Sequence, residues 1–205
     1  MNVTKYLKAL SFFIALWAIP LTGCMGKVKY PTYYTLTLAP PVDPPARGDA
    51  PVSIAVREFR APAYLREGPI VYLTSPDEIG FYEYHRWAVD PRQAITRAIV
   101  EHLRANGTFK LVKIYDGHND VDYILSGSVE KLDEVDYEGG VQVEVAVSAQ
   151  VTDLRSGNTV WANSAADKAK VEERKMSSIV AQMSNVTDRS IEELLKSLTL
   201  PPSTH

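Results

Sequence analysis

The sequence predicts an α+β fold: a single domain with a mixed, largely antiparallel sheet, one crossover helix and a C-terminal amphipathic helix packed on the sheet. Three observations predict it. Several short runs alternate apolar and polar residues with a period of two, which is typical of strands with one buried face. One amphipathic helical stretch, at 91–106, separates two groups of these runs. A second helical stretch, at 176–198, closes the chain and can cover the apolar face of the sheet.

Four strands are predicted before the first helix. Residues 33–38 are β-branched and aromatic with apolar residues at alternate positions, and residues 52–56 alternate in the same way. Two further runs, at 70–73 and 79–82, flank a Ser-Pro-Asp turn sequence at 75–77. The last two runs therefore predict a β-hairpin.

The first helix has clear start and stop signals. Asp90 is a good N-cap, Pro91 suits the first helical position, and Asn106 with Gly107 ends the helix. The apolar stripe of this helix consists of Ala94, Ile95, Ala98, Ile99, His102 and Leu103. Because each large apolar side chain contributes about 1.5 to 3 kcal/mol on burial, we expect this stripe in the core.

After the first helix the period of two returns. Residues 109–115, 123–135 and 141–151 alternate, and a Gly-Asn turn then leads into a run that begins at Thr159. The segment 123–171 therefore predicts an antiparallel meander. The stripe of the last helix, which ends before Pro201, consists of Met176, Ile179, Val180, Met183, Val186, Ile191, Leu194, Leu195 and Leu198.

The N-terminus has the features of an export signal. A basic start with Lys5 and Lys8 precedes an apolar run at 9–20, which is too short for a stable membrane span. The sequence Leu-Thr-Gly-Cys at 21–24 resembles the lipobox of bacterial lipoproteins, in which the thiol is acylated and the chain is cut before it. Cys24 is the only cysteine of the chain, so no internal disulfide can form and lipidation explains the odd thiol. The alternative is a buried structural thiol that follows an uncleaved anchor helix.

This interpretation gives the domain organisation. We expect a lipoprotein signal peptide at 1–23, a tether at 24–31, one domain at 32–200 with a proline-rich loop at 39–51, and a tail at 201–205. The chain has 22 basic and 25 acidic residues, a net charge of -3. Removing residues 1–23 takes away two lysines and no acid, which leaves 20 against 25 and a net charge of -5. This balance excludes a basic surface for nucleic acid.

Catalytic motifs are absent from the sequence. It contains no Gly-x-Ser-x-Gly elbow, no Walker A loop and no His-Glu-x-x-His helix. Asp116, His118, Asp120 and Asp122 alternate oxygen and imidazole groups, but the loop lacks the glycine and the distal glutamate of a calcium loop. We therefore expect no metal, no cofactor and no enzymatic activity. Hydrolase chemistry built from dispersed residues, such as His85 or His118, is the alternative.

The segment 59–87 is unusually rich in aromatic residues. A hairpin with apolar side chains on both faces cannot bury both of them against one small core, so part of it is expected to meet a partner. Tyrosine, tryptophan and arginine are also common in binding hot spots. In the alternative reading, Trp87 and Tyr82 cap the core beside the first helix. The candidate partner-binding residues are Pro62, Tyr64, Leu65, Tyr72, Phe81, Tyr82, Arg86 and Trp87.

The order of these elements resembles one known family. A lipobox, a Tyr-Tyr-x-Leu strand at 33–36, Pro-x-Tyr-Leu at 62–65, Ile-Val-Tyr at 70–72 and Arg-Trp-Ala at 86–88 precede an amphipathic helix. The succession is similar to that of the ABC-type transport auxiliary lipoproteins, the PqiC-like family, and it extends over nearly the whole chain.

The resemblance implies an auxiliary, non-catalytic lipoprotein. It would work with an MCE-domain protein and, through it, with an ABC permease and ATPase that move lipids between the envelope membranes of a Gram-negative bacterium. Met25 after the cysteine favours the periplasmic face of the outer membrane. A homo-oligomer is compatible with this role. A lipid-binding or outer-membrane assembly lipoprotein with its own acyl-chain cavity is the alternative, and an envelope hydrolase is a third.

Overall fold

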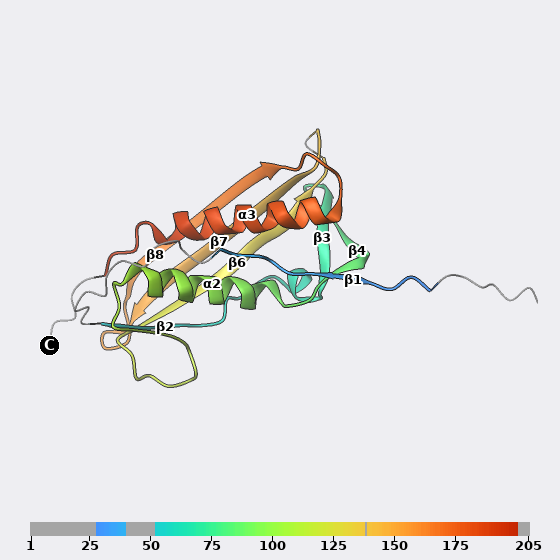
Figure 1. Cartoon of the computed structure of the whole chain (residues 1–205). Helices are drawn as coiled ribbons and strands as arrows, with labels where there is room; N and C mark the ends of the chain where they lie inside the picture. Colours follow the sequence, from blue (N-terminus) through green and yellow to red (C-terminus); the bar gives the residue numbers. More distant parts are fainter. Residues whose placement is uncertain (1–27, 40–51, 138, 201–205) are drawn as a thin grey trace, which may run out of the picture. The chain divides into compact units, whose positions relative to one another are not determined.

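The computed structural model describes residues 28–39, 52–137 and 139–200 (Figure 1). The chain divides into two units, Met1–Tyr30 and Pro31–His205, and the second holds all described helices and strands. Several predicted segments lie wholly or partly outside the described residues: the signal peptide at 1–23, the first half of the tether at 24–31, all but the first residue of the proline-rich loop at 39–51, and the tail at 201–205.

Eight strands form one mixed sheet. They are β1 (Thr32–Tyr34), β2 (Ser53–Val56), β3 (Pro69–Ser75), β4 (Glu78–Trp87), β5 (Leu111–Ile114), β6 (Tyr123–Val135), β7 (Gln142–Asp153) and β8 (Thr159–Lys170). The strand order is β1-β4-β3-β6-β2-β5, and β7 and β8 continue the sheet from β6. The long strands β6, β7 and β8 pair antiparallel, as do β3 and β4. The shorter pairings β1–β4, β2–β5, β2–β6 and β3–β6 are parallel. The predicted fold class is therefore confirmed.

Two α-helices lie on one face of this sheet (Figure 1). The crossover helix α2 (Pro91–Asn106) contacts β2 and β5, and the closing helix α3 (Met176–Leu195) lies over β7 and β8. The predicted N-cap is present, because Asp90 Oδ1 accepts a hydrogen bond from the backbone N–H of Arg92 at 2.9 Å. Gly107 ends α2 in the left-handed conformation, with φ of 68°. Within the part of the chain that the structure describes, no helix combines the length and the apolar character needed to cross a bilayer.

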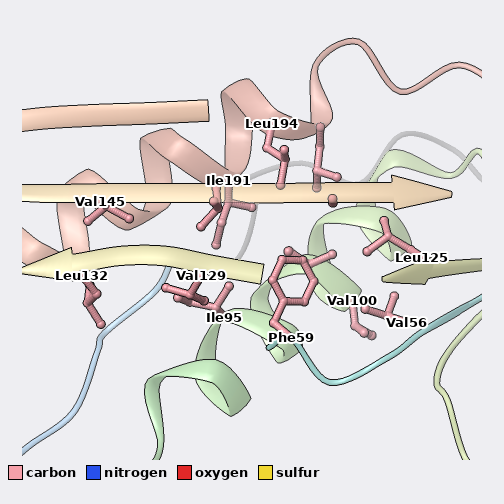
Figure 2. Packing of buried hydrophobic residues seen from close by; sticks show 14 of the residues in the cluster. Val56, Phe59, Ile95, Val100, Leu125, Val129, Leu132, Val145, Ile191 and Leu194 are labelled. Atoms are coloured by element: carbon pink, nitrogen blue, oxygen red, sulfur yellow. The ribbon is translucent and has the colours of Figure 1, made fainter. Parts of the chain in front are cut away.

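The core lies between the sheet and the helices (Figure 2). The helix stripes supply Ile95, Ile99, Ile191 and Leu194, all with no exposed surface. Residues of β6 and β7 on the facing side of the sheet complete it, among them Leu125, Val129, Leu132 and Val145. Among the described residues, the opposite face of the sheet carries no α-helix, and a small separate cluster of Ala55, Val121 and Ile124 lies there. The sheet therefore has one covered face, here called the inner face, and one outer face.

The first predicted strand is shorter than expected. The alternating pattern predicts a strand over 33–38, but β1 ends at Tyr34. Beyond it the backbone bonds to side chains of α3: the N–H of Thr37 donates to Ser184 Oγ at 3.0 Å, and the N–H of Ala39 donates to Asp188 Oδ2 at 3.2 Å. Leu36 and Leu38 are half-buried, and the residue between them is exposed, because these leucines pack against the core between α2 and α3. An alternating pattern alone does not distinguish this arrangement from a sheet.

The other predicted elements are present with shifted ends. The hairpin arms predicted at 70–73 and 79–82 are longer in β3 and β4, and β5 is shorter than the run at 109–115. The meander is formed by β6, β7 and β8. The last helix ends at Leu195 rather than Leu198, although Leu198 is still buried.

Candidate functional site

The β3–β4 hairpin holds most of the predicted partner-binding residues, so its two faces determine which of them a partner can reach. Leu73 pairs with Ile79 of β4 and with Val135 of β6. Side chains of directly paired residues lie on the same face of a sheet, so these three share a face with Asp133. Tyr72, Gly80 and Glu134 are on the opposite face. Because Glu134 pairs with the core residue Val143, this second face is the inner one.

A row of rings lies on the inner side of the hairpin. The ring centroids of Tyr72 and Tyr82 are 4.8 Å apart, and those of Tyr82 and His85 are 5.6 Å apart. His85 also packs against Tyr34 of β1, with 5.6 Å between ring centroids and 3.1 Å between the Tyr34 hydroxyl and His85 Nδ1. Gly80 makes room for this row, since a Cβ there would lie 2.2 Å from the Tyr72 ring.

The row ends at a buried acid. Glu134 has no exposed surface, and its Oε2 accepts a hydrogen bond from the Tyr82 hydroxyl at 2.8 Å. Burial raises the pKa of Glu134, against the opposing effect of the Tyr82 hydrogen bond and of the nearby Arg174. Burial and the bond to Glu134 also raise the pKa of Tyr82. Arg174 itself forms an ion pair with Asp136. The Tyr82 hydroxyl is therefore used in a hydrogen bond to Glu134 within the chain.

Two of the predicted partner-binding residues belong to the core, so their assignment to a contact surface is wrong. Leu65 is 3% exposed and Trp87 is 7% exposed. Trp87 is also held through its backbone, because its N–H donates to the Gly68 carbonyl at 2.7 Å. In the alternative reading of the sequence this tryptophan caps the core, and Trp87 is a member of the buried core cluster. Both side chains stabilise the hairpin and are unavailable to a partner.

Arg86 and Tyr64 are half-buried and have partners within the chain. Arg86 Nη2 donates to the Glu67 carbonyl at 3.0 Å, which ties the end of β4 to the segment before β3. Tyr64 lies in the short 3-10 helix η1 (Ala63–Arg66), and its hydroxyl is near Asp133 on the outer face. Burial, followed by the effect of Asp133, raises the pKa of Tyr64 to about 12. Pro62, just before η1, is partly exposed.

The accessible part of the hairpin is its outer side. Ile79 and Phe81 are 43% and 40% exposed, respectively, and the ladder between them is regular, so they project from the same face of β4. These two residues are called the hairpin patch below. Of the predicted residues only Phe81 belongs to it. Ile79 was not among them, although its apolar side chain two positions before Phe81 was the available signal.

In the acidic loop after β5, carboxylates of Asp116, Asp120 and Asp122 pair with Lys113 or Ser53 of the same chain. Lys113 Nζ lies 3.0 Å from Asp116 Oδ2 and 2.6 Å from Asp120 Oδ1. Asp122 Oδ2 accepts hydrogen bonds from the backbone N–H and the hydroxyl of Ser53. His118 is 79% exposed in the same loop. Within residues 28–39, 52–137 and 139–200, no group of three or more His, Cys, Asp and Glu side chains is arranged to hold a metal ion.

Comparison with known protein families shows which family the chain belongs to. The model of the family described as ABC-type transport auxiliary lipoprotein component matches residues 34–194, which include the hairpin and both α-helices. The chain belongs to this family. Its members are lipoprotein components that are auxiliary to ABC-type transport, so the protein is a membrane-associated auxiliary lipoprotein. The resemblance that the sequence motifs indicate is confirmed.

Solved structures share the fold of this auxiliary lipoprotein. A crystal structure of a protein from Xanthomonas campestris matches with a TM-score of 0.69 at 16% identity, covering 80% of this chain and 92% of the other. A crystal structure of an uncharacterized protein matches with a TM-score of 0.63 at 15% identity, covering 83% and 99%, respectively. At these identities the likeness extends to the fold alone. A comparison with curated protein sequences finds no match.

Proposed function

We propose that this auxiliary lipoprotein is the non-catalytic subunit of an MCE/ABC-type intermembrane phospholipid transport system, and that it docks the periplasmic partner at the outer membrane. The family supports the auxiliary role in ABC-type transport. The chain has no motif for nucleotide binding, so in this proposal ATP hydrolysis belongs to a separate ATPase.

The anchor in this proposal is a set of acyl chains on Cys24, inserted into the periplasmic leaflet of the outer membrane. Each buried methylene contributes about 0.8 kcal/mol, so several chains on one residue make release from the membrane negligible. The tether at 24–31 spans at most about 30 Å when extended. The domain therefore stays close to the bilayer, and a partner from the inner membrane has to reach across the periplasm to it.

The single observation that carries the docking role is the hairpin patch. Ile79 and Phe81 expose large apolar side chains on a strand whose other side is tied to the core through Tyr82 and Trp87. A rigid strand that presents two adjacent apolar side chains to water is typical of a protein contact, because it loses little conformational entropy on binding. We propose that the MCE-domain protein binds here.

The test replaces both patch residues by alanine in the full-length protein. Recovery of a co-expressed MCE-domain protein with the Ile79→Ala/Phe81→Ala variant should fall by at least about tenfold, as for a loss of hot-spot side chains. The matched control is Leu111→Ala/Ile114→Ala, because these β5 side chains are 45% and 48% exposed. The control should recover the partner as the wild type does. Equal recovery with both double variants would remove the hairpin patch from the docking site.

A lipid-binding function is the second candidate, and one groove favours it. Leu36, Leu38, Val89 and Ala94 form the apolar part of a groove of about 360 Å³ between the segment after β1 and helix α2, and Arg97 and Glu101 also line it. A partly apolar groove of this size is small for a phospholipid but can hold part of an acyl chain. Native mass spectrometry of the purified protein tests it: co-purified lipid that is lost on Ala94→Trp would support this function, and a lipid-free wild type would count against it.

A further inference from the structure

The outermost long strand of the sheet has an open edge. β8 pairs with β7 from Trp161 to Lys170, and in the described part of the chain it pairs with no other strand (Figure 1). The other two edge strands, β1 and β5, are three and four residues long, whereas β8 has 12 residues. Backbone N–H and C=O groups along such an edge are a template for a further strand.

Two hydrogen bonds establish which residues of β8 point to this edge. The N–H of Val171 donates to the Val141 carbonyl at 2.9 Å, so this odd-numbered residue continues the ladder toward β7. The N–H of Lys168 instead donates to Asp167 Oδ1 at 2.8 Å, outside the ladder. Along a regular antiparallel pair, successive residues direct their N–H and C=O groups alternately toward the partner strand and away from it. The register from 162 to 170 has no shift, so this alternation is uninterrupted. The N–H and C=O groups of Ala162, Ser164 and Ala166 therefore point away from β7.

This stretch lacks the usual protection of an edge strand. From 162 to 166 there is no proline, no charged side chain and no bulge. The side chains of Ala162, Ser164 and Ala166 project from the outer face and are exposed, and their small size leaves the backbone accessible. The inner side chains, such as Trp161 and Ala165, are half-buried beneath α3. An added strand could therefore pair here while apolar side chains on its inner side pack at the rim of α3.

The charges around the open edge indicate the chemistry of its partner. Beyond Ala166, the outer-face side chains of β8 are Lys168 and Lys170, with no acid of β8 itself on that face. Lys168 Nζ lies 3.5 Å from Glu144 Oε2 of β7, so an acid of an added strand would share this lysine with Glu144. A hollow of about 620 Å³ beside the edge is lined by Ser128, Ser148 and Ser164, and its charged side chain is Arg60. Side chains of a new strand would lie opposite the two lysines and over this hollow. Opposite charges in directly paired positions stabilise strand pairing, and like charges oppose it.

We propose that the edge of β8 from Ala162 to Lys170 binds an extended acidic segment of another polypeptide, which adds to the sheet as a further strand. The main-chain hydrogen bonds to Ala162, Ser164 and Ala166 provide affinity, and the pairing of acids with Lys168 and Lys170 sets preference and register. A second copy of β8 fits less well, because it brings two more lysines and no outer-face acid. This site is separate from the hairpin patch, so the result of one test does not decide the other proposal.

The test uses the full-length protein in detergent and two short synthetic peptides. One alternates valine with glutamate, and the other has lysine in place of glutamate. The glutamate peptide should bind about tenfold more tightly by fluorescence anisotropy, since two charge pairs change from attractive to repulsive. The preference should disappear in Lys168→Gln/Lys170→Gln. In hydrogen exchange, the glutamate peptide should protect the amides of Ala162, Ser164 and Ala166.

A proline substitution at the edge distinguishes strand addition, which needs the backbone N–H groups, from binding through surface side chains alone. Ala166→Pro removes an N–H that lies outside the β7 ladder, so the protein should still fold, with thermal unfolding close to that of the wild type. This variant should lose peptide binding at least tenfold, while the matched Ala166→Val variant, which keeps the N–H, binds as the wild type does. Equal binding of both peptides, binding of neither, or wild-type affinity of Ala166→Pro would overturn the proposal. Amide protection that rises with protein concentration without peptide would overturn it too, in favour of a second copy.

Discussion

Replacing Asp133 by asparagine should make the protein less sensitive to pH. Asp133 lies on the outer face of β6, is 3% exposed, and its Oδ1 has no hydrogen-bond partner among the described residues. Burial, with a further contribution from the carboxylate of Glu144, raises the pKa of Asp133 from 3.8 to about 7. The folded state therefore holds a proton on Asp133 over a pH range in which the unfolded chain has released it.

The sign and size of the effect follow from proton linkage. Below about pH 4 the group is protonated in both states and costs nothing. As the pH rises to about 7, folding has to take up a proton or bury a charge, so the free energy of unfolding falls. Each pH unit in this window corresponds to about 1.4 kcal/mol, which makes the full loss about 4 kcal/mol. Above about pH 7 the loss is complete and constant.

Chemical denaturation at a series of pH values, followed by tryptophan fluorescence, measures this loss. The free energy of unfolding of Asp133→Asn minus that of the wild type should rise by about 4 kcal/mol between about pH 4 and pH 8. Taking this difference removes the pH-dependent contributions that the other acids make equally to the stability of both proteins. Glu130→Gln is the control, because Glu130 is exposed on the same strand, and its pH dependence should follow the wild type. If Asp133→Asn also follows the wild type, Asp133 is not held as a buried neutral acid.

Two further predictions concern stability. Gly127→Ala should destabilise the protein by about 1 to 3 kcal/mol, because a Cβ at Gly127 would lie 2.4 Å from the Phe59 ring and 2.5 Å from the Ser148 carbonyl oxygen; an unchanged melting temperature would mean that both the ring and the backbone of β7 move aside without cost. Asp90→Ala should cost about 1 kcal/mol through the lost N-cap of α2, whereas Asp90→Asn should cost less because an amide oxygen can still accept from Arg92. Both are measured by thermal unfolding, and equal losses for the two Asp90 variants would show that the ion pair with Arg92 matters more than the cap.

Sequence reasoning predicted the elements of this fold because their signals are local. The N-cap at Asp90 and the stop at Gly107 define α2 within one or two residues, and the alternation over 123–135 defines β6. The error at 33–38 has a physical reason. An extended chain that packs between two helices buries alternate side chains just as a strand does, and only the positions of Ser184 and Asp188 reveal the difference.

The candidate site was predicted less well, since aromatic residues are common both in cores and in contact surfaces. Composition indicated the correct segment but could not tell that Trp87 faces the core and Phe81 faces water. The contact between Tyr34 and His85 depends on a parallel pairing of β1 with β4, which joins residues 51 positions apart in the sequence. No local pattern carries such information.

By itself the sequence determined the family, the types and order of the secondary-structure elements, and the resemblance of residues 21–24 to a lipobox, because each depends on neighbouring residues and their spacing. Tertiary structure alone decided which surfaces remain open. Asp133 and Glu134 are consecutive on one strand, and alternation predicts that one of them faces water. Both are buried, because Tyr82 of the hairpin lies against Glu134 on the inner face and the segment with Tyr64 lies against Asp133 on the outer face. The open edge of β8 is likewise a consequence of strand order, which is set by packing between distant segments.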